Sequence, residues 1–116
     1  MDERMDISYL RLSKEDGDVE DGSIDESCSI QSQRTCIKQY LHRKGFSVDR
    51  LSEIIDDGYS GTTMNRPGMN RLIKLVESGK VRTIIVRDFS RFARSYLEAG
   101  HYLEFIFPVY NVRFIS

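Results

Sequence analysis

Short apolar stretches alternate along the chain with stretches of helical spacing, and this alternation predicts the fold. Four segments have the composition of strands: residues 5–12, 51–56, 82–87 and 111–115. The third contains an uninterrupted apolar run from Thr83 to Val86, which is typical of a central strand buried on both faces.

The segments between these strands carry apolar residues at helical spacing. The first is expected to begin at a cap on Ser27 or Ser29 and to run to about Lys44, with Gly45 as its stop. The second begins at Pro67 and ends before Gly79, and the third runs from about Ser95 to Phe107, where Pro108 should block its continuation. The predicted buried stripes are Ile30, Ile37, Tyr40 and Leu41 in the first helix, and Met69, Leu72, Ile73 and Val76 in the second.

The order β-α-β-α-β-α-β predicts an α/β fold with three layers: a mostly parallel sheet of four to five strands with helices on both faces. Sites in such sheets form at the carboxyl ends of the strands. Ser13, Asp57, Ser60 and Arg91 all fall just after predicted strands. We therefore expect one polar site at that edge.

The first strand carries the most informative chemistry. Tyr9, Arg11 and Ser13 alternate with Leu10 and Leu12, so the three polar side chains share one face. A second basic pair, Arg91 and Arg94, lies far downstream at a spacing of three. Guanidinium groups around a hydroxyl suit an attack of that hydroxyl on phosphate. The alternative interpretation is an edge strand whose polar face is in contact with water.

Charge is divided unevenly along the 116 residues. The whole chain has a net charge of −1, but residues 1–28 carry −7 and residues 29–116 carry +6. The basic body is compatible with a polyanionic partner. The acidic run between residues 15 and 26 is typical of a solvated loop, and it lacks the closing carboxylate of a calcium-binding loop.

Composition also excludes several classes of protein. The longest apolar runs are far too short to span a bilayer, and no signal peptide is apparent. Cys28 and Cys36 lack the spacing of a zinc site and are expected to be reduced thiols. His42 and His101 fall within predicted helices, which disfavours a Ser-His-Asp hydrolase.

Five short motifs follow one another in order. They are Tyr9-x-Arg11-x-Ser13, Ser29-Ile30-x-x-Gln33, Asp57-x-x-Ser60-Gly61, Arg66-Pro67-Gly68-Met69 and Arg91-x-x-Arg94. In this order the chain, from Ile7 to Ile115, resembles the catalytic domain of the serine recombinases, the resolvase/invertase family. It looks most like the large serine recombinases, which include integrases and transposases.

The resemblance implies a DNA recombinase that cuts and rejoins DNA. Ser13 would form a 5′-phosphoserine link, Arg11, Arg91 and Arg94 would surround the phosphate, and Gln33 would orient the serine or the phosphate. Supporting roles near the phosphate would fall to Tyr9, Asp57, Ser60 and Arg66. No metal, ATP or other cofactor would be required. The implied partners are double-stranded DNA and further copies of the chain, as a homodimer and as a tetramer in the synaptic complex, in the cytoplasm of a bacterium or from a mobile element.

One departure and two alternatives stay open. Many family members carry an aspartate where this chain has Ser90, and Asp88 lies two residues earlier. The alternatives are a phosphoacceptor signalling domain that uses Asp57 and a non-catalytic module that dimerises or binds DNA. We expect residues 1–116 to be one domain from a longer protein, which alone binds DNA weakly and does not recombine it.

Overall fold

The central sheet of the computed structural model has four parallel strands. The structure describes residues 4–12, 29–49, 51–58, 63–93 and 96–116. The strands are β1 (Met5–Leu12), β2 (Leu51–Asp57), β3 (Val81–Ile85) and β4 (Arg113–Ile115), in the spatial order β2-β1-β3-β4. All three neighbouring pairs are parallel. The predicted parallel α/β sheet is confirmed, with four strands in the described part of the chain.

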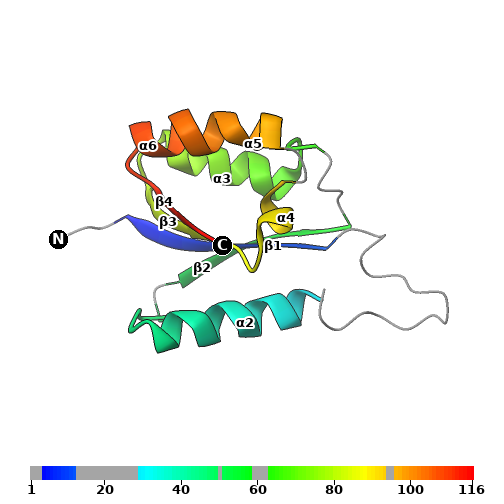
Figure 1. The fold of residues 1–116 in the computed structure, drawn as a ribbon, viewed down its shortest axis with the longest axis vertical. Helices are drawn as coiled ribbons and strands as arrows, with labels where there is room; N and C mark the ends of the chain where they lie inside the picture. The colour runs from blue at the N-terminus through cyan, green and yellow to red at the C-terminus, as the bar shows by residue number, and fades with distance from the viewer. Residues whose placement is uncertain (1–3, 13–28, 50, 59–62, 94–95) are drawn as a thin grey trace.

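Helices cover both faces of the sheet, which confirms the predicted three layers. The helix α2 (Ile30–Arg43) lies on one face, whereas α3 (Pro67–Glu77), α5 (Tyr96–His101) and α6 (Phe107–Val109) lie on the other (Figure 1). A short helix that the sequence pattern did not predict, α4 (Phe89–Phe92), follows β3. Among the described helices, none is both long and apolar enough to cross a membrane.

The ends of α2 and α3 follow the predicted signals, but one stripe residue does not. Ser29 caps α2, and its side chain accepts the Ser32 amide at 3.0 Å. Gly45 and Gly79 have φ values of 81° and 73°, in the left-handed region that glycine adopts without strain. The prediction that Tyr40 is buried is wrong, because it is 38% exposed and Gln33 turns inward with Ile37 and Leu41.

The third helix continues through Pro108, contrary to prediction. Between α5 and α6 the chain forms a π-helical turn, η1 (Tyr102–Ile106), in which the amide of Phe107 bonds to the carbonyl of Tyr102. Proline lacks an amide and crowds the preceding turn of an α-helix. The wider turn immediately before Pro108 accommodates that crowding, so the helix extends to Val109 before β4 begins.

The larger of the two hydrophobic clusters anchors the segment that follows β3. Phe92 is completely buried, and its ring packs edge-on against Phe107 and Phe114, with centroids 5.8 and 5.0 Å away. Ala93 beside it is also buried. These contacts hold α4 against the sheet and thereby fix the position of Arg91.

Candidate active site at the carboxyl edge of the sheet

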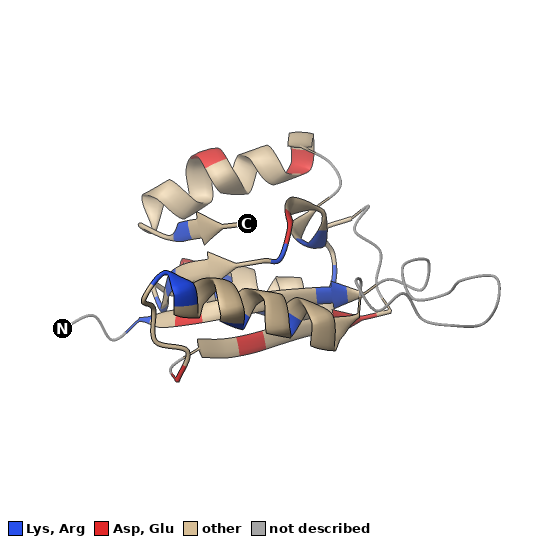
Figure 2. Ribbon diagram, turned by 60° about the horizontal axis from the view of Figure 1, so that its bottom comes forward, with Lys and Arg blue, Asp and Glu red and all other residues tan. Residues whose placement is uncertain are grey.

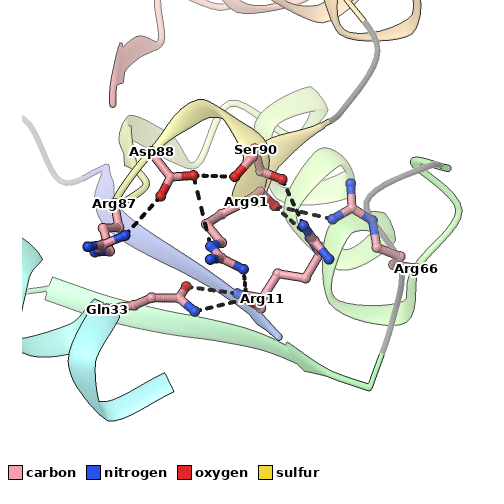
Figure 3. A network of polar contacts seen from close by, with 7 residues as sticks. All are labelled: Arg11, Gln33, Arg66, Arg87, Asp88, Ser90 and Arg91. Atoms are coloured by element: carbon pink, nitrogen blue, oxygen red, sulfur yellow. Dashed lines mark hydrogen bonds and ion pairs between the residues drawn. The ribbon is translucent and has the colours of Figure 1, made fainter. Parts of the chain in front are cut away.

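Two arginines from distant parts of the chain meet where β1 and β3 end. These strands are parallel neighbours, so their carboxyl ends lie at the same edge. Arg11 lies near the end of β1, and Arg91 lies in α4 directly after β3 (Figure 3). The structure brings these two residues together at this edge, whereas Ser13, Ser60 and Arg94 lie outside the described residues.

The side chain of Arg11 joins the first strand to α4. It is completely buried. Its Nε donates to the carbonyl of Arg91 at 3.2 Å and its Nη2 donates to the carbonyl of Ser90 at 2.8 Å. A planar guanidinium presents fixed donors that match two neighbouring acceptors. Arg11 therefore fixes the α4 backbone relative to β1 across 80 residues of sequence.

Gln33 contacts the backbone of Arg11. Its Nε2 donates to the Arg11 carbonyl at 2.9 Å, and its Oε1 accepts the Arg11 amide at 3.2 Å. The amide side chain thus pairs with both polar groups of one strand residue, as a neighbouring strand would. The sequence analysis placed Gln33 beside Ser13 or the phosphate. In the structure Gln33 contacts Arg11, the residue two positions before Ser13 in the sequence, and this contact docks α2 to the end of β1.

A second buried network joins Tyr9, Asp56 and Arg66. The Tyr9 hydroxyl donates to Asp56 Oδ2 at 2.6 Å and accepts from Arg66 Nη1 at 3.0 Å. All three side chains are at most 2% exposed. Burial and the hydrogen bond to Asp56 raise the pKa of Tyr9 well above its ordinary value, so the phenol stays protonated. Its proton is therefore available to the Asp56 carboxylate.

Asp56 is a functional candidate that the sequence analysis missed, and it caps α3. Arg66 occupies the cap position of that helix but makes no capping bond through its side chain. The two Asp56 oxygens instead accept the amides of Gly68 and Met69, at 2.7 and 2.9 Å. The first amides of a helix need acceptors, and a carboxylate is favourable at that end. Asp56 therefore sets the position of α3 relative to β2.

Asp57, the residue chosen from the sequence, lies on the face of β2 opposite to that of Asp56. It is exposed and lines a cavity of about 320 Å³ together with Asp56, Pro67 and Arg71. Alternation in the sequence does not distinguish the two acids, because Ile54 shares a face with Asp56 and Ile55 shares a face with Asp57. In the structure it is Ile54 that points into the core, so Asp56 lies on the buried face and Asp57 does not.

Arg66 is buried rather than facing solvent. Besides Tyr9, its guanidinium donates to the carbonyl of Arg91 at 3.3 Å and to that of Phe92 at 2.5 Å. Its carbon Cζ also lies 5.5 Å from the centre of the Tyr9 ring. Arg66 and Arg11 therefore hold the same α4 backbone, Arg11 from β1 and Arg66 from the start of α3.

Positive charge is concentrated inside this edge. Arg11, Arg66 and Arg91 are at most 5% exposed, and the hydrogen bonds described above direct their guanidinium groups chiefly to carbonyl oxygens. Burying like charges together is costly unless an anion is near. Outside this cluster, basic and acidic positions are interspersed along the described parts of the ribbon (Figure 2). Within the described ranges, no three His, Cys, Asp or Glu side chains are grouped as a metal site.

Comparison with known families identifies the chain. Residues 7–116 match the family model described as the N-terminal domain of resolvase. The chain belongs to this family. No curated protein matches the chain significantly.

Solved structures of serine recombinases have the same fold. The N-terminal catalytic domain of TP901-1 integrase superimposes with a TM-score of 0.76 at 24% identity, over 97% of this chain and 76% of that one. The C-terminal catalytic domain of ISC1926 TnpA, an IS607-like serine recombinase, gives 0.68 at 26% identity, over 95% and 65%. A serine recombinase from Sulfolobus solfataricus gives 0.64 at 21% identity, over 97% and 66%. The predicted family and resolvase-like fold are confirmed.

Proposed function

We propose that this resolvase-family domain breaks and rejoins DNA through Ser13. The observation that supports this most strongly is the meeting of three buried guanidinium groups, those of Arg11, Arg66 and Arg91, at the strand edge from which Ser13 follows. Such a concentration of cationic donors is suited to the charge that develops on a phosphoryl group. The family assignment favours this chemistry over a phosphoacceptor domain that uses Asp57.

In the proposed reaction the Ser13 oxygen attacks the phosphorus of a DNA phosphodiester. A bond from the serine oxygen to phosphorus forms, and the bond from phosphorus to the 3′ oxygen breaks. Ser13 loses its proton and the departing 3′ oxygen gains one, so the products are a 5′-phosphoserine link and a 3′-hydroxyl. The reverse attack by a 3′-hydroxyl reseals the strand, and the ester conserves the bond energy without ATP.

Arg11, Arg91 and Arg94 are proposed to neutralise the phosphate oxygens during this step. In the structure, the guanidinium of Arg11 donates to the carbonyls of Ser90 and Arg91. These carbonyl oxygens are acceptors of the kind that a phosphate presents. We propose that phosphate oxygens replace part of this set when DNA binds, with the carbonyls of α4 moving aside. Gln33 supports the step by holding the Arg11 backbone, and Tyr9 and Arg66 support it by fixing α3 and α4. We also propose roles near the phosphate for Asp57 and Ser60.

The partners proposed for this function are double-stranded DNA and further copies of the chain, as a homodimer that assembles into a tetramer. These proposals follow the family assignment. A non-catalytic module that only dimerises or binds DNA would keep the partners and lack the covalent step.

Covalent capture tests the proposal without knowledge of a target site. The protein is incubated with a pool of random-sequence DNA duplexes, denatured in SDS, and precipitated with potassium so that only covalently attached DNA is recovered. We expect recovery of DNA whose 5′ end is linked to Ser13, identified by mass spectrometry of the digested adduct. Ser13→Ala should abolish recovery. An adduct that survives this substitution would refute the nucleophile assignment, and binding without any adduct would favour the non-catalytic module.

A further inference from the structure

One carboxylate at the candidate site contacts three side chains at once. Asp88 Oδ2 accepts from Arg87 Nη1 at 3.1 Å, and Asp88 Oδ1 accepts the hydroxyl of Ser90 (Figure 3). The same Oδ1 lies 3.9 Å from Nε of Arg91. Asp88 therefore lies between two arginines, with the serine hydroxyl fixing the orientation of its carboxylate.

Asp88 does not have the usual role of its position. It precedes α4 as the cap residue, with extended backbone angles of −151° and 165°, but its side chain makes no capping bond. Its carboxylate is turned towards the arginines instead. The backbone of α4 is held separately, through the carbonyl contacts of Arg11 and Arg66 and through buried Phe92. Loss of the Asp88 charge should therefore leave the helix in place.

The guanidinium of Arg91 lies between Asp88 and the end of β1. Its Nε faces the Asp88 carboxylate, and its Nη1 donates to the Arg11 carbonyl at 3.4 Å. The Arg91 side chain is 6% exposed, whereas that of Asp88 is 40% exposed. The carboxylate thus closes the solvent side of a nearly buried cation. Charges in a nearly buried setting are weakly screened by salt, so the Asp88 carboxylate attracts the side of the guanidinium that carries Nε.

The other arginine connects Asp88 to α2. Arg87 follows β3, and the side chain of Cys36, together with the Asp88 carboxylate, raises the pKa of its guanidinium above the ordinary value. Asp88 is therefore contacted by Arg87, which lines the same cavity as Cys36 of α2, and by Ser90 of α4.

We infer that Asp88 is a positioning residue for Arg91, and that the Ser90 hydroxyl holds the Asp88 carboxylate in place for this task. This inference rests on the proposed function, in which Arg91 contacts the phosphate. It adds that a carboxylate outside the predicted catalytic set, that of Asp88, orients Arg91 without itself touching DNA.

The first arm of the test observes Arg91 directly and needs no DNA. The Nε–H group of Arg91 is followed by ¹⁵N NMR, its signal being identified by its loss in Arg91→Lys. Asp88→Asn keeps the size and the acceptor oxygen but removes the charge. We expect the Arg91 signal to lose order and its exchange with water to accelerate roughly tenfold, while backbone signals of the sheet stay in place. Asp49→Asn, an exposed acid outside the site, is the matched control.

The second arm measures the rate of covalent DNA capture. Asp88→Asn should lower it by roughly 10- to 100-fold, since displacement of a catalytic group by about 1 Å has effects of that order. Ser90→Ala should have a smaller effect in the same direction. The double variant Asp88→Ser with Ser90→Asp returns a carboxylate to the pair from its other end and should recover most of the loss in both arms. Asp49→Asn should match the unaltered protein.

The two arms distinguish failure of the inference from failure of the proposed function. An Arg91 signal unchanged in Asp88→Asn overturns the inference, whatever the DNA result. A disordered Arg91 with an unchanged capture rate overturns the claim that its position matters for the reaction. If the unaltered protein forms no adduct, the proposed function fails, and the NMR arm alone decides whether Asp88 positions Arg91.

Discussion

The hydroxyl of Tyr9 donates a 2.6 Å hydrogen bond to the carboxylate of Asp56, in the interior of the domain. This bond joins β1 to β2 on the face that carries α3, and the same carboxylate holds the first amides of that helix. Tyr9 also accepts from Arg66, so one phenol links an acid and a base that lie on different elements. The pair of Tyr9 and Asp56 thereby holds Arg66, one of the three buried arginines of the site.

Removing the Tyr9 hydroxyl should destabilise the domain. Tyr9→Phe leaves Asp56 with one donor fewer and Arg66 with one acceptor fewer, both in a dry environment. We expect the free energy of unfolding to fall by about 1–3 kcal/mol, measured by urea denaturation. Tyr40→Phe, at a position 38% exposed, should change it by less than about 0.5 kcal/mol. Equal effects of the two substitutions would contradict the role assigned to this bond.

Substitution of the two adjacent acids of β2 should destabilise the domain to very different extents. Asp56→Asn removes a charge that accepts two helix amides and the Tyr9 hydroxyl, and its new amide group directs hydrogens towards donors. We expect a loss of about 2–4 kcal/mol in the free energy of unfolding. Asp57→Asn, on the exposed face, should cost less than about 0.5 kcal/mol. A larger loss for Asp57→Asn than for Asp56→Asn would reverse the assignment.

Gly68 should not tolerate a side chain. A Cβ at this position would lie 2.8 Å from Asp56 Oδ2 and 2.8 Å from Ile54 Cγ2, which is too close for either atom. Gly68→Ala should therefore cost about 1–3 kcal/mol in thermal or urea unfolding. Gly100→Ala offers the matched control, because Gly100 lies in α5 with open space around it. That substitution should stabilise the protein by about 0.5–1 kcal/mol, and a stable Gly68→Ala protein would rule out the close contact.

Alkaline pH should reveal the buried phenol. The pKa of Tyr9 is raised in the folded protein above its ordinary value near 10.0. Above that pH the unfolded chain releases this proton and the folded chain retains it, so the unfolded state binds fewer protons and stability falls as pH rises. Below pH 10 the contribution of Tyr9 is fully present. Between pH 10 and 11 we expect the unfolding free energy to fall more steeply, by up to about 1.4 kcal/mol per pH unit, than in Tyr9→Phe. Parallel pH profiles for the two proteins would exclude this linkage.

Replacing Arg11 by lysine should loosen α4. A lysine retains the charge but cannot direct donors to the carbonyls of Ser90 and Arg91 in the fixed plane of a guanidinium. We expect faster hydrogen exchange of the amides of Arg91 and Ala93, which bond to Asp88 and Phe89 in that turn. Exchange in the central part of β3 should change little, and Arg82→Lys, in a half-exposed pair with Asp6, provides the control. Unchanged protection of Arg91 and Ala93 would show that Arg11 does not hold the turn.

The spacing of apolar residues and the helix-capping residues in the sequence determined the order of strands and helices. The four strand segments and the apolar run through Ile84 and Ile85 could be predicted, and the cap of α2 could be narrowed to Ser27 or Ser29, because each depends on residues close in the chain. The ordered motifs also indicated the resolvase family, which the family model confirms. The chemical roles of Ser13, Arg91 and Arg94 remain predictions.

Only the tertiary structure decided which polar groups meet inside the site. Asp56, and not Asp57, contacts the start of α3, because Asp56 lies on the face of β2 against which that helix packs. The hydrogen bonds from Arg11 to the carbonyls of Ser90 and Arg91 join residues that are 79 and 80 positions apart in the sequence. The continuation of the last helix through Pro108 likewise depends on a π-helical turn that local propensity does not encode. Local pattern specifies secondary structure because its causes are neighbouring residues. The pairing of buried charges is decided by long-range packing, because the partner of each group is whichever distant atom the fold brings within reach of it.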